Sequence, residues 1–303
     1  MIEKNFDLPG IVLITAVLLG CIFLGSGYTG SLVVWMAIAA VMAASLRFVL
    51  LIGELNFASA AFFGIGAYCT GYIANTAELP FCATLALSAV LALLVSVVFG
   101  CITLKVKGPY FLLIGFAFTE AMRILYTRTD ALGGNSGLVN IFPPAWLDAY
   151  YQYFVTVLCF ALVLGLLAIE RSHLGKIFIA IRDNENVVRS VGNRVFLTKV
   201  VCFAIASGVA GLAGSLHAFA NNVISPLDFG FMLSTFALAY LKVGGEDSAL
   251  GPVVGAVLLV GIASWAQSLG GSEHILYGAA IVLSVLFMPK GLMGLLQRRG
   301  GGQ

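Results

Sequence analysis

The sequence predicts an all-α membrane protein, a polytopic bundle of about ten transmembrane helices. Of its 303 residues, 60% are hydrophobic and 10% are charged, whereas a soluble domain has roughly 25% charged residues. Apolar runs close to the roughly 20 residues of a spanning helix recur along the whole chain. No linker rich in Pro or Ser and no run of charge separates them. We therefore expect one transmembrane domain over residues 1–303.

Glycine, proline and charged residues interrupt the apolar sequence, and the segments between these interruptions define the expected spans. In chain order they are 9–27, 31–52, 55–75, 81–104, 110–126, 150–169, 197–220, 229–243, 251–269 and 274–288. A signal peptide is an alternative for the first, but only Lys4 precedes it and another long apolar run follows at once, which favours a retained helix. Segments 229–243 and 274–288 are short, so each is either a half-helix or packed inside the bundle.

Basic residues are spread unevenly over the connections between these spans. If the N-terminus is cytoplasmic, all 16 lysines and arginines except Arg123 and Arg128 fall at cytoplasmic ends. Positive charge marks the cytoplasmic side of membrane proteins, so we expect both termini inside. The formal net charge of +2 is too small to indicate nucleic-acid binding.

Glycines occur within the expected spans as well as between them. They include Gly64, Gly66 and Gly71, then Gly208, Gly211 and Gly214, and finally Gly251 and Gly255. Because lipid gives little hydrophobic drive for helices to associate, small residues that allow close backbone approach promote packing. The pattern predicts a tightly packed bundle.

Residues 170–199 are expected to leave the membrane, because only this stretch is dense in charges of both signs. Asp183 or Asn184 is suited to cap the start of a short helix, Glu185 then lies in its first turn, and Gly192 suits the left-handed position after its end. We expect Val187, Val188 and Val191 on one side of this helix and Arg189 on another. So short a helix is unstable alone in water and needs support, either from a partner or only from its own bundle.

Eight residues of this segment form a characteristic pattern: Gly175, Lys176, Ala180, Ile181, Arg182, Asn184, Glu185 and Gly192. The pattern resembles the coupling segment of membrane subunits in branched-chain amino acid ABC importers, the high-affinity leucine/isoleucine/valine import family. Further motifs of this family follow in family order at 60–68, 108–111, 132–138, 208–216, 225–226, 244–245 and 250–256. Of the two permeases in such systems, the chain is similar to the M-type subunit.

Two departures from the family pattern are visible. Ala58 and Ser59 stand where Gly-His or Gly-Gln is common, and Glu246 and Asp247 follow a Gly-Gly pair where Leu-Gly is common. The first can alter substrate preference, and related permeases carry urea or short amides.

The resemblance implies an ATP-driven importer in which other subunits hydrolyse the ATP. It implies two cytoplasmic ATP-binding subunits that hold ATP and Mg, a second permease subunit, an extracytoplasmic substrate-binding protein and a bacterial-type inner membrane. The residues expected to contact the ATPase are Arg182, Asp183, Asn184, Glu185, Arg189 and Gly192. The chain itself has no Gly-rich loop ending in Gly-Lys-Ser/Thr that could bind phosphates, so we expect neither an ATPase site nor a bound cofactor.

Polar residues within apolar spans are the candidates for the substrate path: Asn56, Ser59, Tyr68, Glu120 and Arg123. Glu120 and Arg123 lie three residues apart and so share a helix face, and ionisable groups inside a membrane usually face a cavity or each other. A structural ion pair is the alternative. The six cysteines all lie in apolar runs, and neither they nor the three histidines show metal-ligand spacing, so no metal site is expected.

An ion-coupled secondary transporter is the rival function. Such carriers usually need a carboxylate near the membrane midplane, for which only Glu120 qualifies. An intramembrane enzyme ranks third, because no nucleophile and base or metal-ligand constellation is apparent.

The topology can be tested with single cysteines in a variant that lacks the native ones. An impermeant thiol reagent added from outside should react at three outer positions, Glu78, Asp130 and Asp228. It should not react at three inner positions, Lys107, Asn186 and Gln297, because basic connections stay in the cytoplasm. The opposite labelling pattern would overturn the orientation, and labelling at Lys107 alone would break the span order.

Overall fold

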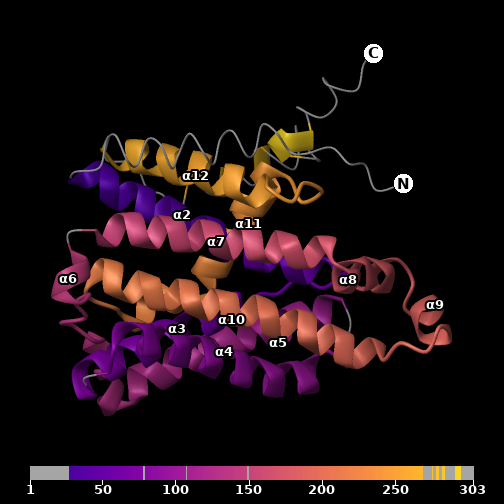
Figure 1. The fold of residues 1–303 in the computed structure, drawn as a ribbon, viewed down its shortest axis with the longest axis horizontal. Helices are drawn as coiled ribbons and strands as arrows, with labels where there is room; N and C mark the ends of the chain where they lie inside the picture. Colours follow the sequence, from indigo (N-terminus) through magenta and orange to yellow (C-terminus); the bar gives the residue numbers. More distant parts are fainter. Residues whose placement is uncertain are drawn as a thin grey trace. The chain divides into compact units, whose positions relative to one another are not determined.

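The computed structural model describes residues 27–268 except 78, 107 and 149, together with residues 275, 278–279, 282–283 and 291–294. Its longer helices are α2 (Tyr28–Leu50), α3 (Ser59–Thr76), α4 (Phe81–Thr103), α5 (Pro109–Arg128), α7 (Tyr151–Arg171), α10 (Val195–Asn221), α11 (Phe231–Gly244) and α12 (Gly251–Ser268) (Figure 1). Shorter ones are α6 (Ala145–Asp148), α8 (His173–Asp183), α9 (Glu185–Ser190), η1 (Asp130–Leu132), η2 (Gly134–Ser136) and η3 (Pro226–Phe229).

The predicted fold class, a polytopic helical membrane bundle, is confirmed. The eight longer helices overlap eight of the expected spans, and five of them, α2, α4, α5, α7 and α10, are long and apolar enough to cross a bilayer. Helices α11 and α12 contain shorter apolar stretches. The expected span 9–27 and most of 274–288 lie outside the described residues, so the count of ten and the location of the termini stay predictions.

Two compact units make up the chain. Unit 1 comprises Met1–Ala44, Gln152–Val163 and Phe236–Gln303, and unit 2 comprises Ser45–Tyr151 and Leu164–Thr235. Helices α2, α7 and α11 contribute residues to both units. All the candidate site residues belong to unit 2.

Helix α3 lies at the centre of unit 2, in contact with both α10 and α4. Most of its side chains are buried, so the neighbouring helices shield it from lipid and it need not be as apolar as they are. A Cβ built at Gly66 would lie 1.9 Å from the carbonyl oxygen of Gly211, and one built at Gly214 would lie 1.9 Å from that of Phe63. The expected packing through small residues is therefore confirmed at the contact between α3 and α10.

The same kind of contact occurs within unit 1. A Cβ at Gly255 would lie 1.9 Å from the carbonyl oxygen of Tyr240, and one at Gly244 would lie 1.8 Å from that of Gly251. The glycines of α12 thus allow this helix to approach the second half of α11 closely.

The connection between α5 and α6 is anchored to the one that follows α10. Leu138 and Ile224 form an isolated antiparallel bridge, in which each amide donates to the other's carbonyl at 2.9 to 3.0 Å. Next to it, Gly137 has a φ of +73°, and a Cβ there would lie 2.0 Å from the Ile224 oxygen. Glycine is required here by both conformation and space.

A matched pair of substitutions tests the packing of α3. Gly66→Ala should lower the free energy of unfolding by about 1–3 kcal/mol, because the new methyl group overpacks the contact with Gly211. Gly165→Ala in α7, where nothing lies within 4 Å of the added Cβ, should be neutral or more stable by about 1 kcal/mol through helix propensity. Thermal unfolding in detergent measures both, and equal behaviour of the two variants would contradict the packing.

Candidate functional site

Helix α9 begins with the cap that the sequence favours. The Asn184 side-chain oxygen accepts hydrogen bonds from the amides of Asn186 at 3.0 Å and Val187 at 3.4 Å. Of the two expected caps, Asn184 is therefore the one used, while Asp183 ends α8. Glu185 follows as the first helical residue, where its negative charge is favoured by the helix dipole.

The end of α9 has the expected left-handed glycine. Gly192 has a φ of +88°, and its amide donates to the carbonyl of Arg189 at 3.0 Å. The amide of Asn193 donates to the carbonyl of Val188 at 3.4 Å. Together these two bonds form a Schellman motif, so this short helix is capped at both ends.

The prediction that Val187, Val188 and Val191 share one side of α9 is wrong. Val188 is buried and packs with Ile181 of α8 and Val195 of α10. Val187 and Val191 are 58% and 76% exposed. They lie four residues apart and share a face, whereas Val188 is one position further around the helix and points elsewhere. The inward valine attaches α9 to unit 2, and the outward ones remain uncovered.

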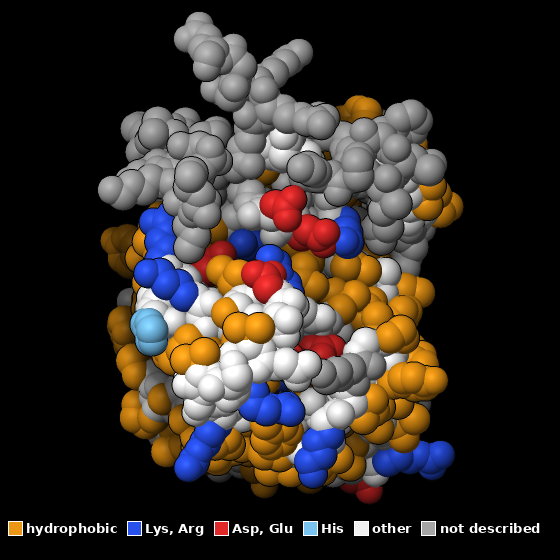
Figure 2. Space-filling view, turned by 90° about the vertical axis from the view of Figure 1, so that its right-hand side faces the viewer, with side chains coloured by type: hydrophobic (Ala, Val, Ile, Leu, Met, Phe, Trp, Pro, Cys, Tyr) orange, Lys and Arg blue, Asp and Glu red, His pale blue; other side chains and the backbone are white. Residues whose placement is uncertain are grey.

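Charged side chains accompany the two exposed valines. Arg182, Asp183 and Arg189 are all exposed, and the Arg182 Nε lies 3.7 Å from the Asp183 Oδ1. Figure 2 shows Lys and Arg side chains interspersed with hydrophobic ones on the side of the molecule turned to the viewer. Aliphatic groups beside guanidinium groups are suited to bind a protein surface.

A buried charge cluster holds the start of α9. The Lys199 ammonium, in the second turn of α10, contacts the Glu185 carboxylate and lies 3.5 Å from the Glu54 Oε1. Lys199 and Glu54 are 3% and 5% exposed. Burial raises the pKa of the Glu54 carboxyl above its ordinary value, although the Lys199 ammonium and a backbone hydrogen bond from Gly108 act in the opposite direction.

This cluster was not predicted from the sequence. Lys199 counted there only among the basic residues at cytoplasmic ends, and Glu54 was not assigned a role. One signal was available, because Glu54 is flanked by Leu51, Ile52 and Leu55, and a charged residue among apolar ones implies a partner.

A second ion pair joins the ends of α2 and α7. Arg47, near the end of α2, donates from both terminal nitrogens to the two carboxylate oxygens of Glu170 at 2.7 and 2.9 Å. Both side chains are largely buried. Such bidentate pairs fix geometry strongly, so the end of α2 is held to the end of α7.

The chain between α2 and α3 is irregular and buried. The expected span begins at residue 55, but α3 begins only at Ser59, because the Asn56 side-chain oxygen accepts the Ala58 amide at 2.9 Å just before the helix. The Phe57 carbonyl accepts the hydroxyl of Thr119 in α5 at 2.9 Å and that of Ser234 in α11 at 2.8 Å.

Ser59 belongs to the same polar cluster. Its hydroxyl lies 3.3 Å from that of Ser234, and Asn56 and Ser59 are each 2% exposed. The structure therefore brings Asn56 and Ser59 together with two hydroxyls, those of Thr119 and Ser234, that sequence analysis did not select.

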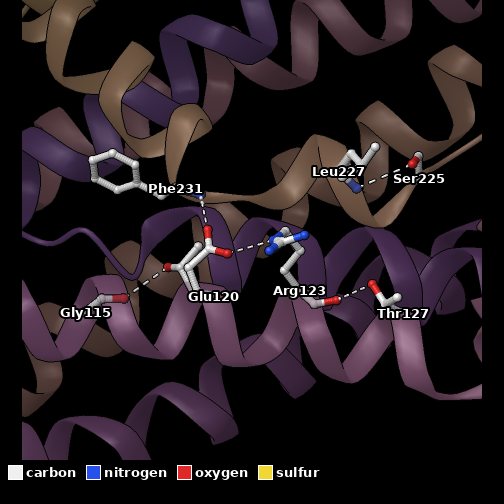
Figure 3. Close-up of polar contacts among 8 residues, drawn as sticks. Gly115, Glu120, Arg123, Thr127, Ser225, Leu227 and Phe231 are labelled. Atoms are coloured by element: carbon white, nitrogen blue, oxygen red, sulfur yellow. Dashed lines mark hydrogen bonds and ion pairs between the residues drawn. The ribbon is translucent and has the colours of Figure 1, made fainter. Parts of the chain in front are cut away.

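Glu120 and Arg123 form the ion pair expected from their spacing, with 2.7 Å between the Arg123 Nε and the Glu120 Oε2 (Figure 3). The second oxygen of Glu120 accepts the Phe231 amide at 3.0 Å. Phe231 is the first residue of α11, so the carboxylate fixes the start of that helix. The Phe231 ring stacks on that of Phe57 at 5.5 Å, which links this pair to the Asn56 and Ser59 cluster.

Tyr68 lies apart from the other path candidates. It is nine residues beyond Ser59, about 13 Å along the axis of α3. Its ring stacks on Tyr126 with 4.0 Å between ring centroids and meets Phe229 edge-on at 5.5 Å. Among the described residues, its hydroxyl has no hydrogen-bond partner. Asn56 and Ser59 thus lie in one polar cluster, and the Glu120 and Arg123 pair is linked to it through the rings of Phe57 and Phe231, whereas Tyr68 lies among aromatic rings.

These features define the class of protein: a multi-pass helical membrane protein with a capped helix exposed beside its spans and a polar cluster inside them. The chain belongs to the family described as branched-chain amino acid transport system / permease component, whose model matches residues 28–288.

Curated relatives agree with this family. The chain is 27% identical over 272 residues to the high-affinity branched-chain amino acid transport system permease protein LivM of Escherichia coli K12, covering 80% of this chain and 64% of that protein. The same values hold for LivM of Salmonella typhimurium LT2. A probable branched-chain amino acid transport permease protein LivM of Methanocaldococcus jannaschii is 23% identical over 228 residues, 68% of this chain and 66% of that protein.

The chain thus spans a little less than two thirds of the length of these relatives. No solved structure is significantly similar to it.

Proposed function

We propose that this protein is the membrane-spanning subunit of an ATP-driven importer for branched-chain amino acids in a bacterial-type inner membrane. The observation that carries this proposal is α9, a helix capped at both ends and attached by Val188, with Val187, Arg189 and Val191 exposed. A helix that short persists only when supported. Its exposed side chains, with Val187 and Val191 on one side and Arg189 on the other, have the composition of a docking surface. Family membership supports the substrate class.

The partners follow from this role. Two cytoplasmic subunits would bind ATP and Mg and hydrolyse the nucleotide, a second permease subunit would complete the path, and an extracytoplasmic protein would deliver the substrate. The exposed side chains of Arg182 and Arg189 can form charge-assisted hydrogen bonds with carboxylates of an ATPase. Val187 and Val191 add apolar contact, which helps to hold α9 in a fixed position on the ATPase surface.

The polar cluster at the start of α3 is the proposed substrate path. A branched-chain amino acid needs few polar contacts to cross, because a pore that binds tightly would slow release. Asn56, Ser59 and Ser234 offer a few such groups beside the rings of Phe57 and Phe231. Ser59 stands at the position where the family pattern varies, so it is suited to influence which solute passes.

The ion-coupled alternative is less well supported by the geometry. Its one candidate carboxylate, Glu120, already accepts hydrogen bonds from Arg123 and from the Phe231 amide. A coupling site needs a carboxylate that can take up and release an ion.

If Val187 and Arg189 contact an ATPase, changing both should weaken assembly specifically. Val187→Asp combined with Arg189→Glu should reduce co-purification of the ATPase subunits about tenfold or more, since each interface anchor contributes on the order of 1–2 kcal/mol. Both side chains are exposed, so the thermal stability of the permease should stay unchanged.

Arg128→Glu is the matched control for this variant. Arg128 is exposed and is the last residue of α5, on the side expected to face outward. Its charge reversal should leave co-purification intact. If the α9 variant also assembled and transported normally, this helix would be only a solvated part of the bundle.

The path assignment predicts a second, separable effect. Ser59→Leu should lower leucine uptake about tenfold or more, because a bulky side chain fills the cluster beside Ser234, while substrate binding to the receptor stays intact. Ser88→Leu is the control, since Ser88 is also fully buried but, within the part of the chain that the structure describes, its hydroxyl bonds the Leu85 carbonyl of its own helix and no other helix. If both variants lost stability and uptake to the same extent, Ser59 would have no special place in the path.

A further inference from the structure

We propose that Lys199 is a positioning residue that passes movement of α9 to the irregular segment 51–58 at the start of the substrate path. The proposal rests on the proposed function, in which α9 docks on an ATPase. In this proposal, the buried Lys199 ammonium connects α9 with the polar groups of Asn56, Phe57 and Ser59.

The first step is the charge arrangement. The Lys199 ammonium lies between the carboxylate of Glu185, the first residue of α9, and that of Glu54, in segment 51–58. All three side chains are largely buried, with side-chain exposures of 4%, 19% and 6% for Lys199, Glu185 and Glu54. Away from water, opposite charges attract more strongly and separating them is costly. A displacement of Glu185 therefore changes the electrostatic interaction at Glu54, because both carboxylates contact the same ammonium.

The charges of the cluster also allow a second arrangement. Three charged groups together carry a net charge of −1, because two carboxylates share one ammonium. If α9 moves outward and takes Glu185 into water, Glu54 and Lys199 remain as a neutral pair. A coupling element needs two discrete arrangements that a partner can bias. Here these are Glu185 paired with Lys199 and Glu185 withdrawn into water.

The second step leads from Glu54 to the path. Phe57 follows three residues later in a segment without regular structure, and its carbonyl accepts the hydroxyls of Thr119 and Ser234. Its ring stacks on Phe231, the residue whose amide donates to Glu120. A shift of Glu54 thus alters contacts with Thr119 of α5 and with Ser234 and Phe231 of α11 together.

The apolar contact of α9 leads elsewhere than segment 51–58. Val188 packs on Ile181 and Val195, which attaches α9 to α8 and α10. Arg182 of α8 does approach that segment, since a Cβ at Gly53 would lie 3.2 Å from its Cγ. That contact involves the preceding helix, whereas Lys199 contacts α9 itself.

The test uses the complete transporter, with its ATPases and binding protein, in proteoliposomes. The readout is the ratio of leucine-stimulated to basal ATP hydrolysis, alongside ATPase co-purification. Lys199→Met should lower this ratio about fivefold or more towards one, since the ammonium no longer joins the two carboxylates. Lys199→Arg keeps the charge and should retain most of the ratio. Glu185→Gln leaves Glu54 and Lys199 paired, and should lower the ratio with the least effect on folding.

A neutral triple variant separates coupling from stability. Lys199→Met with Glu54→Gln and Glu185→Gln removes all three charges, so no buried charge is left unpaired. It should insert and co-purify with the ATPases like the unmodified protein, yet still show the lowered ratio. Lys242→Met is the control, because Lys242 of α11 pairs at 2.5 Å with Glu246, just beyond the end of that helix. It should leave the ratio unchanged.

The outcomes distinguish the two proposals. If the unmodified protein binds no ATPase or shows no leucine-stimulated hydrolysis, the proposed function fails. If the unmodified protein couples and the neutral triple variant or Glu185→Gln couples equally well, only the role of Lys199 fails. A lowered ratio in the triple variant with intact assembly would support it.

Discussion

The close backbone contact between α3 and α10 is the constraint on which unit 2 depends. Without side chains at Gly66 and Gly214, the two helices approach until carbonyl oxygens of one lie against the α-carbons of the other. A buried central helix then needs neighbours on its other sides, which α4 and α5 provide. The same approach brings the second turn of α10, with Lys199, near the chain that leads into α3. Helix packing thus determines where the charge cluster forms.

Hydropathy and capping chemistry predicted much of this structure, since both are local properties of the sequence. Eight expected spans correspond to helices because a long apolar run has few alternatives in a bilayer. The caps of α9 were predictable because an asparagine side chain and a glycine at these positions act on their own neighbours. The pairing of Glu120 with Arg123 was predictable for the same reason, as three residues separate them on one helix face.

The features that sequence analysis missed all depend on contacts between distant segments. Glu54 and Lys199 are far apart in the chain, and nothing local indicates that they meet. The inward direction of Val188 follows from where α8 and α10 lie, which periodicity over one and a half turns cannot define. The late start of α3 arises because Asn56 bonds the backbone before the helix begins, and its apolar neighbours conceal this.

The double capping of α9 has a consequence for how reversibly it can engage another protein. The amides of Asn186 and Val187 bond the Asn184 side chain, and the carbonyls of Val188 and Arg189 bond the turn at Gly192, so these groups do not depend on any outside surface. A partner can therefore leave this helix without exposing them as orphan groups. The helix keeps its shape between engagements, and repeated cycles of contact require no refolding of the element that makes the contact.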